Sequence, residues 1–268
     1  MIDRGRHSVL GVGIDAVDYE AAVARVMLAA REGRRCTASA LAVHGVMTGA
    51  LDDVHRHRLN ALDLVVPDGQ PVRWALYWLH GISLPDRVYG PNLTLRVLEA
   101  AAREGVPVYF YGSTPDTLLL LLERLRERIP NLQVAGSETS KFRRLSPEEV
   151  GETTRRIRWS GARIVVVGLG CPRQEVFAWE NGDALEMPVL AVGAAFDFHA
   201  GTLKQAPPSL QRVGLEWAFR LWQEPRRLWK RYLYLNPTYL TYLALQRVGL
   251  LSLVVRRSVA PRESERYG

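Results

Sequence analysis

Short apolar runs alternate with amphipathic stretches over the first 200 residues of the chain. Runs of this kind are typical of strands buried on both faces of a sheet, and they lie at 8–14, 37–43, 64–66, 106–111, 132–135, 164–167 and 189–192. Helical spacing of apolar residues fills the intervals between them, after Asp18 and at 44–60, 70–80, 93–104, 115–128, 146–159 and 172–181. This alternation predicts an α/β fold with a mostly parallel sheet flanked by helices.

The pattern changes after residue 200. Residues 210–235 are helical in composition and dense in Trp, Tyr and Arg, and another apolar run follows at 238–255. Gln246 and Arg247 interrupt that run, which is too short and too broken for a membrane span. Packing at a membrane interface suits it better, and the last dozen residues are expected to fray.

Charge divides the chain at the same place. The net charge is +7, but residues 201–268 hold twelve Lys/Arg against four Asp/Glu, so residues 1–200 carry a net charge of −1. We therefore expect a core at 1–200 and a basic helical appendage at 201–268. Such a segment points to an anionic partner: nucleic acid, an acidic lipid surface or a phosphorylated substrate.

The cysteines and the N-terminal residues indicate the cellular compartment in which the protein is expected. Cys36 and Cys171 lie far apart, without a CxxC motif or a Cys/His cluster, which argues against a disulfide scaffold or a structural zinc site. No apolar run near the N-terminus is long enough for a signal peptide. The expected compartment is the cytoplasm.

Asp68 lies where the apolar run 64–66, ended by Pro67, passes into a helix that Pro71 can begin. Ligands of open α/β sheets bind at the carboxyl ends of the strands. Asp68 is therefore a candidate general base acting on a hydroxyl group. The alternative is ordinary turn chemistry, in which the carboxylate accepts backbone N–H groups, and position alone favours this alternative.

A glycine-rich turn reading Gly-Leu-Gly-Cys-Pro-Arg-Gln-Glu follows the strand at 164–167 and opens a helix. It is a weak NAD fingerprint, because Arg173 replaces the third glycine and no ribose-binding acid follows at the expected distance. It is a better nucleotide or sugar loop, since Gly168 and Gly170 allow a ligand to approach the backbone, and the helix N-terminus offers N–H groups. Arg173 and Gln174 would project polar groups, while a plain turn remains the alternative.

Two further strand-end segments carry candidate residues. Gly112 and Ser113 begin a second turn of the same kind, and the two turns together suggest a phosphate-bearing ligand across the switch point of the sheet. Asp197 and His199 would lie on the same side of the chain if this segment were extended, and could then form a metal-binding pair. No third ligand stands at a metal-like spacing. A capping Asp and a surface His are favoured there, and no Asp-x-Asp pair occurs, so no metal site is predicted.

Aromatic and basic residues interleave over 215–232. Nucleic-acid stacking, membrane-interface binding and pyrophosphate clamping all use this mixture. An amphipathic helix that packs its aromatic residues on the core is a further interpretation.

Four blocks of the chain are shared with a known family. They cover 63–69, 87–90, 168–175 and 192–201, the last leading to Lys204, Ala206-Pro207, Glu216-Trp217, Arg220 and Glu224-Pro225. In this order, and over about 10–235, the chain resembles the WecG/TagA/CpsF family of bacterial glycosyltransferases. Four blocks in order are more specific than any one of them alone.

The resemblance implies a Rossmann-like core and an inverting, metal-independent transfer without a cofactor. A sugar would move from a UDP donor to a hydroxyl of a membrane lipid-linked saccharide. By the resemblance, Asp68 matches the proposed general base and Arg87 and Gln174 match polar groups that line the site. A basic C-terminal appendage would close over the donor and meet the membrane.

The family's members make teichoic-acid linkage units, enterobacterial common antigen or exopolysaccharides, from UDP-N-acetylmannosamine, its uronate or UDP-glucose-type sugars. The chain departs from the family at the end of the second strand, where many members carry a Thr-x-Asn pattern that shapes the acceptor site. Here Ala40 and Ala42 stand there, with His44 just beyond. The departure bears on the identity of the sugar and acceptor more than on the reaction type.

An inverting transfer needs a base on the acceptor hydroxyl and charge relief on the departing UDP. Asp68 is expected to supply the base, and arginines of the appendage are expected to bind the diphosphate in place of a metal. The candidate substrate-binding residues are Arg87, Gly112, Ser113, Gly168, Gly170, Arg173, Gln174, Asp197, Arg220, Arg226 and Arg227.

We therefore expect an enzyme attached peripherally to the inner face of the bacterial cell membrane. Its expected partners are the UDP-sugar, the lipid-linked acceptor and an anionic membrane surface, with no nucleic acid; self-association into a homo-oligomer stays open. Two alternatives remain: a peripheral membrane or nucleic-acid-binding protein with an inactive α/β body, and an NAD-dependent oxidoreductase.

Overall fold

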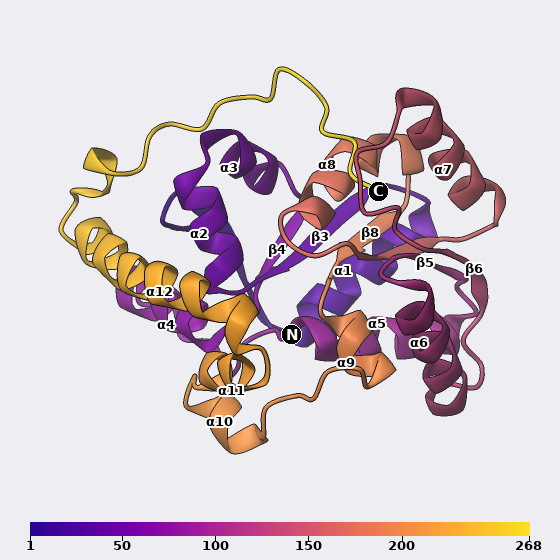
Figure 1. Cartoon of the computed structure of the whole chain (residues 1–268), viewed down its shortest axis with the longest axis horizontal. Coiled ribbons are helices and arrows are strands. Elements are labelled where there is room, and N and C mark those ends of the chain that lie inside the picture. The colour runs from indigo at the N-terminus through magenta and orange to yellow at the C-terminus, as the bar shows by residue number, and fades with distance from the viewer.

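The computed structural model describes residues 1–268 (Figure 1). Its strands are β1 Asp3–Val9, β2 Val12–Val17, β3 Cys36–Leu41, β4 Leu64–Pro67, β5 Val108–Gly112, β6 Val134–Glu138, β7 Ile164–Gly168 and β8 Pro188–Ala191. Its helices are α1 Tyr19–Glu32, α2 Val43–Leu51, α3 Asp53–Asn60, α4 Gln70–His80, α5 Gly90–Glu104, α6 Pro115–Arg128, α7 Pro147–Trp159, α8 Arg173–Leu185, α9 Ala195–Ala200, α10 Pro208–Arg212, α11 Glu216–Gln223 and α12 Pro225–Arg247, followed by the 3₁₀ turn η1 Leu251–Leu253.

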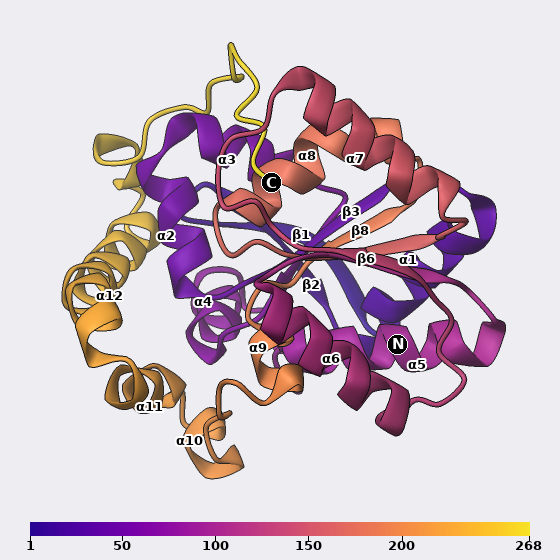
Figure 2. The same cartoon turned by 45° about the vertical axis from the view of Figure 1, so that its right-hand side comes forward.

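Six strands form one parallel sheet in the order β4-β3-β8-β7-β5-β6. Its apolar runs feed two cores: in β4, Val65 packs on one side of the sheet while Leu64 and Val66 pack on the other. Helices α2, α3, α7 and α8 cover one face, and α1, α5, α6 and α9 cover the other (Figure 2). The fold is α/β and Rossmann-like, which confirms the prediction from the sequence.

The run at 8–14, expected to be one strand, is the centre of the antiparallel hairpin β1–β2. Leu10 and Gly11 have φ angles of 54° and 82°, the positive values that a two-residue hairpin turn requires. The prediction of a single strand was wrong because the apolar residues continue through the turn, so the sequence pattern shows no break there. The hairpin lies beside the sheet, where Asp15 accepts the N–H of Val65 at 2.6 Å.

The segment 44–60 forms two helices, α2 and α3, where one was expected. Asp52 separates them: its backbone is extended, and its carboxylate accepts the N–H groups of Val54 and His55 at 2.9 Å each. This is helix N-cap geometry, so a residue that begins the new helix cannot continue the old one. The break directs α3 towards α8, which it contacts.

Two helices with clear start signals begin where the sequence predicts. Helix α6 begins at Pro115, after Thr114 as its N-cap. Helix α7 follows a complete capping box, in which Ser146 and Glu149 each bind the other's backbone N–H. Both helices flank the sheet, on opposite faces (Figure 2).

Residues 201–268, hereafter the C-terminal segment, lie outside the two helix layers (Figure 2). Helix α12 contacts α2 and α4, and Leu228, Tyr239 and Leu243 are the residues it buries. The apolar run at 238–255 is divided between α12 and η1. None of the helices is both long and apolar enough to cross a membrane.

The last residues are docked, and the expectation that they fray was wrong. In Figure 1 the chain returns from η1 across α3 and ends beside α7 and α8. The N–H groups of Glu265 and Arg266 donate to the Glu180 carboxylate at 2.6 and 2.9 Å, and the Gly268 carbonyl accepts from Ser140 Oγ at 2.8 Å. These partners are distant in the sequence, so the polar composition of the tail does not reveal them.

Candidate active site

One large cavity lies at the carboxyl ends of the strands. Its volume is about 850 Å³, and it is lined by residues that follow β3, β4, β5, β7 and β8. The C-terminal segment supplies further lining residues between 213 and 240. Open α/β sheets bind their ligands at this edge, and the volume is typical of small-molecule sites.

All but two of the candidate residues line this cavity, namely Asp68, Arg87, Ser113, Gly168, Gly170, Arg173, Gln174, Asp197, Arg220 and Arg227. Gly112 and Arg226 are the exceptions. A Cβ on Gly112, which has a φ of 116°, would lie 2.7 Å from the backbone of Gly168. Glycine is therefore required at 112 for the close approach of two strand ends, which is a packing constraint.

Asp68 follows β4, and its Oδ1 accepts the N–H of Gly90 at 2.5 Å. Burial raises the pKa of Asp68 to about 6. The charge of Glu216 adds to this rise, while Arg87 and the Gly90 N–H oppose it. A carboxylate that titrates close to neutral pH is well suited to act as a general base.

Arg87 joins the segment before α5 to the C-terminal segment. Its Nη2 lies 2.7 Å from Glu216 Oε2 and donates to Gln211 Oε1 at 2.8 Å. The guanidinium also stacks over the Tyr89 ring, 4.2 Å from its centroid, and Arg87 is only 5% exposed. Since its charge is already paired, the main structural effect of Arg87 is to hold α10 and α11 near Asp68.

The glycine-rich turn forms another wall of the cavity. Gln174 stiffens it: its Oε1 accepts the N–H of Gly170 at 3.1 Å, and its Nε2 donates to Glu175 Oε1 at 2.8 Å. A Cβ on Gly193 would lie 2.4 Å from Gln174 Oε1, so the neighbouring strand end packs directly on this amide. Arg173, in contrast, is exposed at the cavity.

Asp197 and His199 lie in helix α9, and the extended arrangement that would pair them is absent. Residues two apart on a helix point in different directions. Asp197 lines the cavity, and burial raises its pKa. His199 is half-buried and its Nε2 lies 2.9 Å from the Pro91 carbonyl oxygen.

Three arginines from α11 and α12 line the cavity: Arg220, Arg227 and Arg231. Arg227 pairs with Glu224, but the other two have no carboxylate within 4.0 Å, and Arg220 Nε is buried without a hydrogen-bond partner. Burial and the charge of Arg227 lower the pKa of Arg231. Crowded guanidinium groups with unused donors form a site for a polyanion.

Arg231 replaces Arg226 in this group. Adjacent residues on a helix are about 100° apart around its axis, whereas residues four apart share a face. Arg227 and Arg231 therefore face the cavity together, and Arg226 does not line it. The four-residue spacing of Arg227 and Arg231 could have identified Arg231 from the sequence. Arg226 was predicted in its place because the prediction considered charge and not helical spacing.

His44 also lines the cavity, beside Ala40 and Ala42. Burial, together with the charges of Arg231 and Arg220, lowers the pKa of His44 to about 4. Its imidazole is therefore neutral near pH 7 and offers one hydrogen-bond donor and one acceptor. A neutral group of this kind suits a hydroxyl-rich ligand. In the sequence, His44 was noted only because it follows the position where the family's Thr-x-Asn pattern is missing.

The chain also matches a known family. The model described as "Glycosyl transferase WecG/TagA/CpsF family" matches residues 7–252. The matched region contains Asp68, the glycine-rich turn and the three arginines of α11 and α12, so it spans both walls of the cavity.

Proposed function

The chain belongs to the WecG/TagA/CpsF family of glycosyltransferases, and on that premise we propose an inverting, metal-independent transfer from a UDP-sugar to a membrane lipid-linked saccharide. One observation carries this proposal: Asp68, at the sheet, shares a cavity with Arg220, Arg227 and Arg231 of the C-terminal segment. The sugar would be N-acetylmannosamine, its uronate or a glucose-type sugar. The product would enter a cell-wall polymer such as teichoic acid, or an exopolysaccharide.

Asp68 acts as the base in this proposal. Its carboxylate takes the proton of the acceptor hydroxyl while the hydroxyl oxygen forms a bond to the anomeric carbon of the donor. The bond from that carbon to the phosphate oxygen breaks, and its electron pair leaves with UDP, which inverts the anomeric centre. The raised pKa of Asp68 supports this role, since a carboxylate titrating at about 6 is ionised at neutral pH and more basic than an ordinary one.

The arginines relieve the charge that develops on the departing UDP. Arg220 and Arg231 lack a carboxylate partner, so their donors are available to the two phosphates. Guanidinium groups bind such oxygens in pairs of parallel hydrogen bonds, and preorganised cations stabilise charge strongly in a site that excludes water. Three of them would do here what a divalent cation does in metal-dependent sugar transferases.

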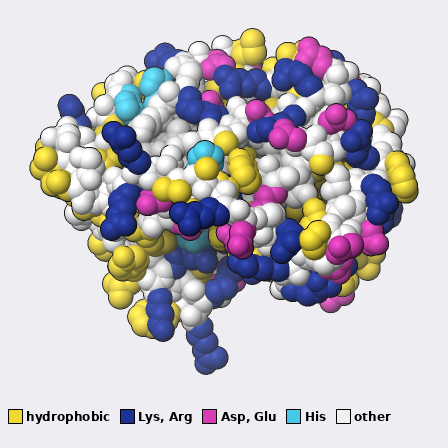
Figure 3. All heavy atoms as spheres, turned by 90° about the horizontal axis from the view of Figure 1, so that it is seen from above, with side chains coloured by type: hydrophobic (Ala, Val, Ile, Leu, Met, Phe, Trp, Pro, Cys, Tyr) yellow, Lys and Arg dark blue, Asp and Glu magenta, His cyan; other side chains and the backbone are white.

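We further infer that the C-terminal segment closes over the donor and rests on the inner face of the cell membrane. Its large exposed side chains include Trp222, Trp229, Leu233, Tyr234 and Leu240. Hydrophobic side chains gather at the left of Figure 3, the side on which α12 and η1 lie in Figure 1. Aromatic and basic groups together suit the headgroup region of an anionic membrane.

The direct test is UDP release from a panel of UDP-sugars, with and without lipid-linked acceptors. We expect release that depends on the acceptor for one class of sugar, a product of inverted anomeric configuration, and no stimulation by added Mg²⁺ or Mn²⁺. A transfer that retains the configuration, or that requires added Mg²⁺, would contradict this mechanism.

A thermal-shift comparison separates the alternative functions. UDP should raise the unfolding temperature, because a ligand that binds only the folded state stabilises it. Stabilisation by NAD or by RNA without stabilisation by UDP would favour the oxidoreductase or the nucleic-acid-binding protein. The substitution of Arg173 for the third fingerprint glycine already disfavours NAD.

A further inference from the structure

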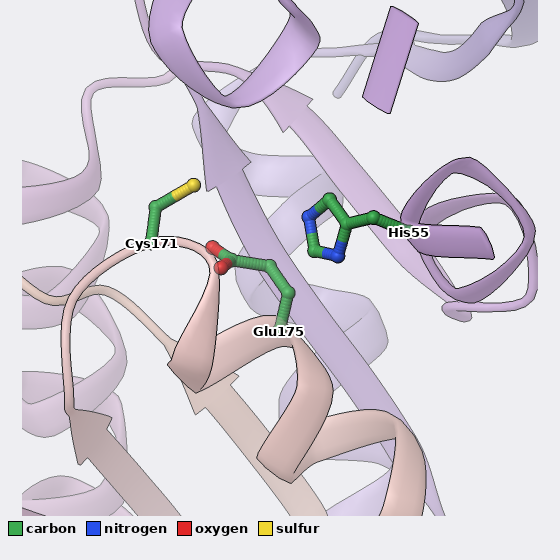
Figure 4. A group of neighbouring side chains, drawn as sticks. All are labelled: His55, Cys171 and Glu175. Carbon is green, nitrogen blue, oxygen red and sulfur yellow. The ribbon is translucent and has the colours of Figure 1, made fainter. Parts of the chain in front are cut away.

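Three side chains of metal-binding type converge between α3 and the start of α8 (Figure 4). His55 comes from α3, Cys171 from the glycine-rich turn and Glu175 from the first turn of α8. A ring nitrogen of His55, the Cys171 sulfur and a Glu175 carboxylate oxygen all lie within 4.8 Å of one another. None of the three was a candidate ligand in the sequence, because position 55 is far from 171 and 175 along the chain.

Polar atoms in this group lack partners. His55 is 2% exposed, and neither Nδ1 nor Nε2 forms a hydrogen bond. Glu175 is fully buried, and its Oε2 has no nitrogen or oxygen partner either; its neighbour is the Cys171 thiol. Buried polar atoms are almost always satisfied in native proteins, so two such side chains facing the same group indicate that an additional partner binds there.

The Glu175 carboxylate is held in position by its other oxygen. Oε1 accepts hydrogen bonds from Ser39 Oγ at 3.0 Å and from Gln174 Nε2 at 2.8 Å. Hydrogen bonds of this kind orient metal-binding carboxylates in known sites. Oε2 is thereby left as the free ligand atom.

We propose that His55, Cys171 and Glu175 bind a Zn²⁺ ion that ties α3 to the glycine-rich turn. A thiolate, an imidazole nitrogen and a carboxylate oxygen are zinc ligands with bonds of about 2.0–2.3 Å, which places tetrahedral ligand atoms roughly 3.5 Å apart. The three ligand atoms lie up to 4.8 Å apart in the structure. Rotation of the side chains therefore has to bring them roughly 1 Å closer together to bind the ion. Thiolate and imidazole ligands also favour Zn²⁺ over Mg²⁺ or Ca²⁺.

The charges of this site balance. The Cys171 thiol releases its proton to solvent on binding, so the thiolate and the Glu175 carboxylate together neutralise the ion. A neutral assembly is compatible with a buried position, whereas an unpaired charge is not. Water can complete the coordination, since Cys171 and Glu175 reach the wall of the active-site cavity while His55 does not line it.

The role of the ion would be structural. Asp68 and the three arginines contribute no ligand, so the site goes beyond the proposed transfer and does not depend on its mechanism. The ion would brace the turn that Gln174 also stiffens. This proposal revises the expectation, based on cysteine spacing, that the chain has no structural zinc.

A metal-free arrangement is the competing account. After a small rotation, a protonated Glu175 could donate a hydrogen bond to His55, which would satisfy both side chains. That pair needs neither an ion nor Cys171. The two accounts therefore differ in what they require of the thiol.

The test uses the full-length protein after dialysis against a chelator. Co²⁺ serves as a spectroscopic probe for zinc: we expect thiolate-to-cobalt charge-transfer absorption with tetrahedral ligand-field bands, both abolished by an equimolar amount of Zn²⁺. Zn²⁺ should also raise the unfolding temperature. Absence of the thiolate–cobalt absorption in the wild-type protein would overturn the proposal without reference to any variant.

Matched variants test the ligand set. His55→Ala and Cys171→Ala should each lower the Zn²⁺ affinity by more than about 10-fold, while His57→Ala, on the same helix, and Cys36→Ala, at the other cysteine, should not. Cys171→Ser retains the side-chain size if the alanine variant fails to fold. Wild-type Zn²⁺ affinity in folded Cys171 variants would support the hydrogen-bonded pair and refute the zinc site.

Discussion

At the scale of a single residue, the ionised form of Asp68 that the reaction needs is the form that lowers the stability of the fold. Its carboxylate is half-buried near Glu216, and loss of solvent raises its pKa from 3.8 to about 6. Because the folded-state pKa lies above the unfolded value, the stabilising contribution of Asp68 is present at low pH and is lost as the pH rises through about 6. At neutral pH the ionised carboxylate therefore costs stability, which is expected of a group positioned for chemistry.

Replacing Asp68 by asparagine should separate these two effects. We expect turnover to fall by about 10²–10⁴-fold, because the amide cannot accept the acceptor's proton. The unfolding temperature at pH 7.5 should be unchanged or higher, since the amide is neutral and its oxygen can still accept the Gly90 N–H. Rates of UDP release and thermal unfolding, measured side by side, check both parts; a near-normal rate would reduce Asp68 to a turn residue.

The pH dependence of the wild-type enzyme should report the same group. Only the ionised carboxylate is a base, so kcat/KM should be level above a pH of about 6 and fall roughly tenfold per unit below it. Initial rates over a pH series, corrected for any unfolding, provide the measurement. A profile that stays level down to pH 4.5 would exclude Asp68 as the rate-determining base.

At the scale of elements, α11 couples the C-terminal segment to the base. Glu216, on α11, pairs with Arg87 at 2.7 Å and contributes to the raised pKa of Asp68. The same ion pair thus positions the helix and adjusts the chemistry at the end of β4. Removing only the charge of Glu216 should reveal the second effect.

We expect Glu216→Gln to move the acid limb of kcat/KM to lower pH. The substitution removes a negative charge near Asp68, whose pKa should therefore fall, while the side-chain size and the position beside Arg87 are retained. Glu224→Gln, on the same segment, is the control, because Glu224 is not among the causes of the Asp68 shift. An acid limb that coincides in the wild type and in Glu216→Gln would contradict this coupling.

The arginines that α11 and α12 direct into the cavity should decide donor binding. Arg220→Gln and Arg231→Gln should each lower kcat/KM by about 10–100-fold, the value of a lost charged hydrogen bond to phosphate. Arg226→Gln carries the same charge change outside the cavity and should have little effect. Calorimetric titration with UDP measures the affinity of each variant. If the Arg226 variant loses as much affinity as the other two, Arg220 and Arg231 are not specific diphosphate ligands.

At the scale of the whole molecule, the C-terminal segment is part of the folded unit. Tyr239, Leu243 and Val255 are buried in a core that they share with the sheet and its helices. Deleting the segment would expose these contacts and would confuse loss of fold with loss of function. Substitution of its exposed side chains is therefore the cleaner test of membrane attachment.

We expect the double variant Trp222→Ser, Trp229→Ser to lose binding to anionic liposomes while retaining the wild-type unfolding temperature. Trp222 is 78% exposed and Trp229 is about half exposed, at 49%, and neither belongs to the buried core. Trp159→Ser on α7, 80% exposed, is the matched control and should bind normally. Wild-type binding should weaken as salt screens the basic residues; salt-independent binding, or equal loss in the control, would argue against this surface.

Local sequence pattern was sufficient to predict most of the strands and helices and the residues at their ends, the hairpin at 8–14 and the helix break at Asp52 excepted. Buried strands and amphipathic helices follow from local periodicity, and the strand-end rule then placed Asp68 and the turn at Gly168 at the same edge of the sheet. Two of the four family blocks, 63–69 and 168–175, contain these positions. Such features need only a few neighbouring residues, which is why α6 and α7 begin within one residue of the predicted positions 115 and 146.

Contacts between residues far apart in the chain became visible in the folded structure alone. The pairing of Arg87 with Glu216, the presence of Arg231 beside His44, and the docking of the last residues on Glu180 all depend on where the chain returns after a long excursion. The His55 group depends on a helix break at Asp52 that turns α3 towards α8. Periodicity reports which face of an element is buried, but the choice of partner depends on the packing of the whole chain, so these contacts could not be read from local pattern.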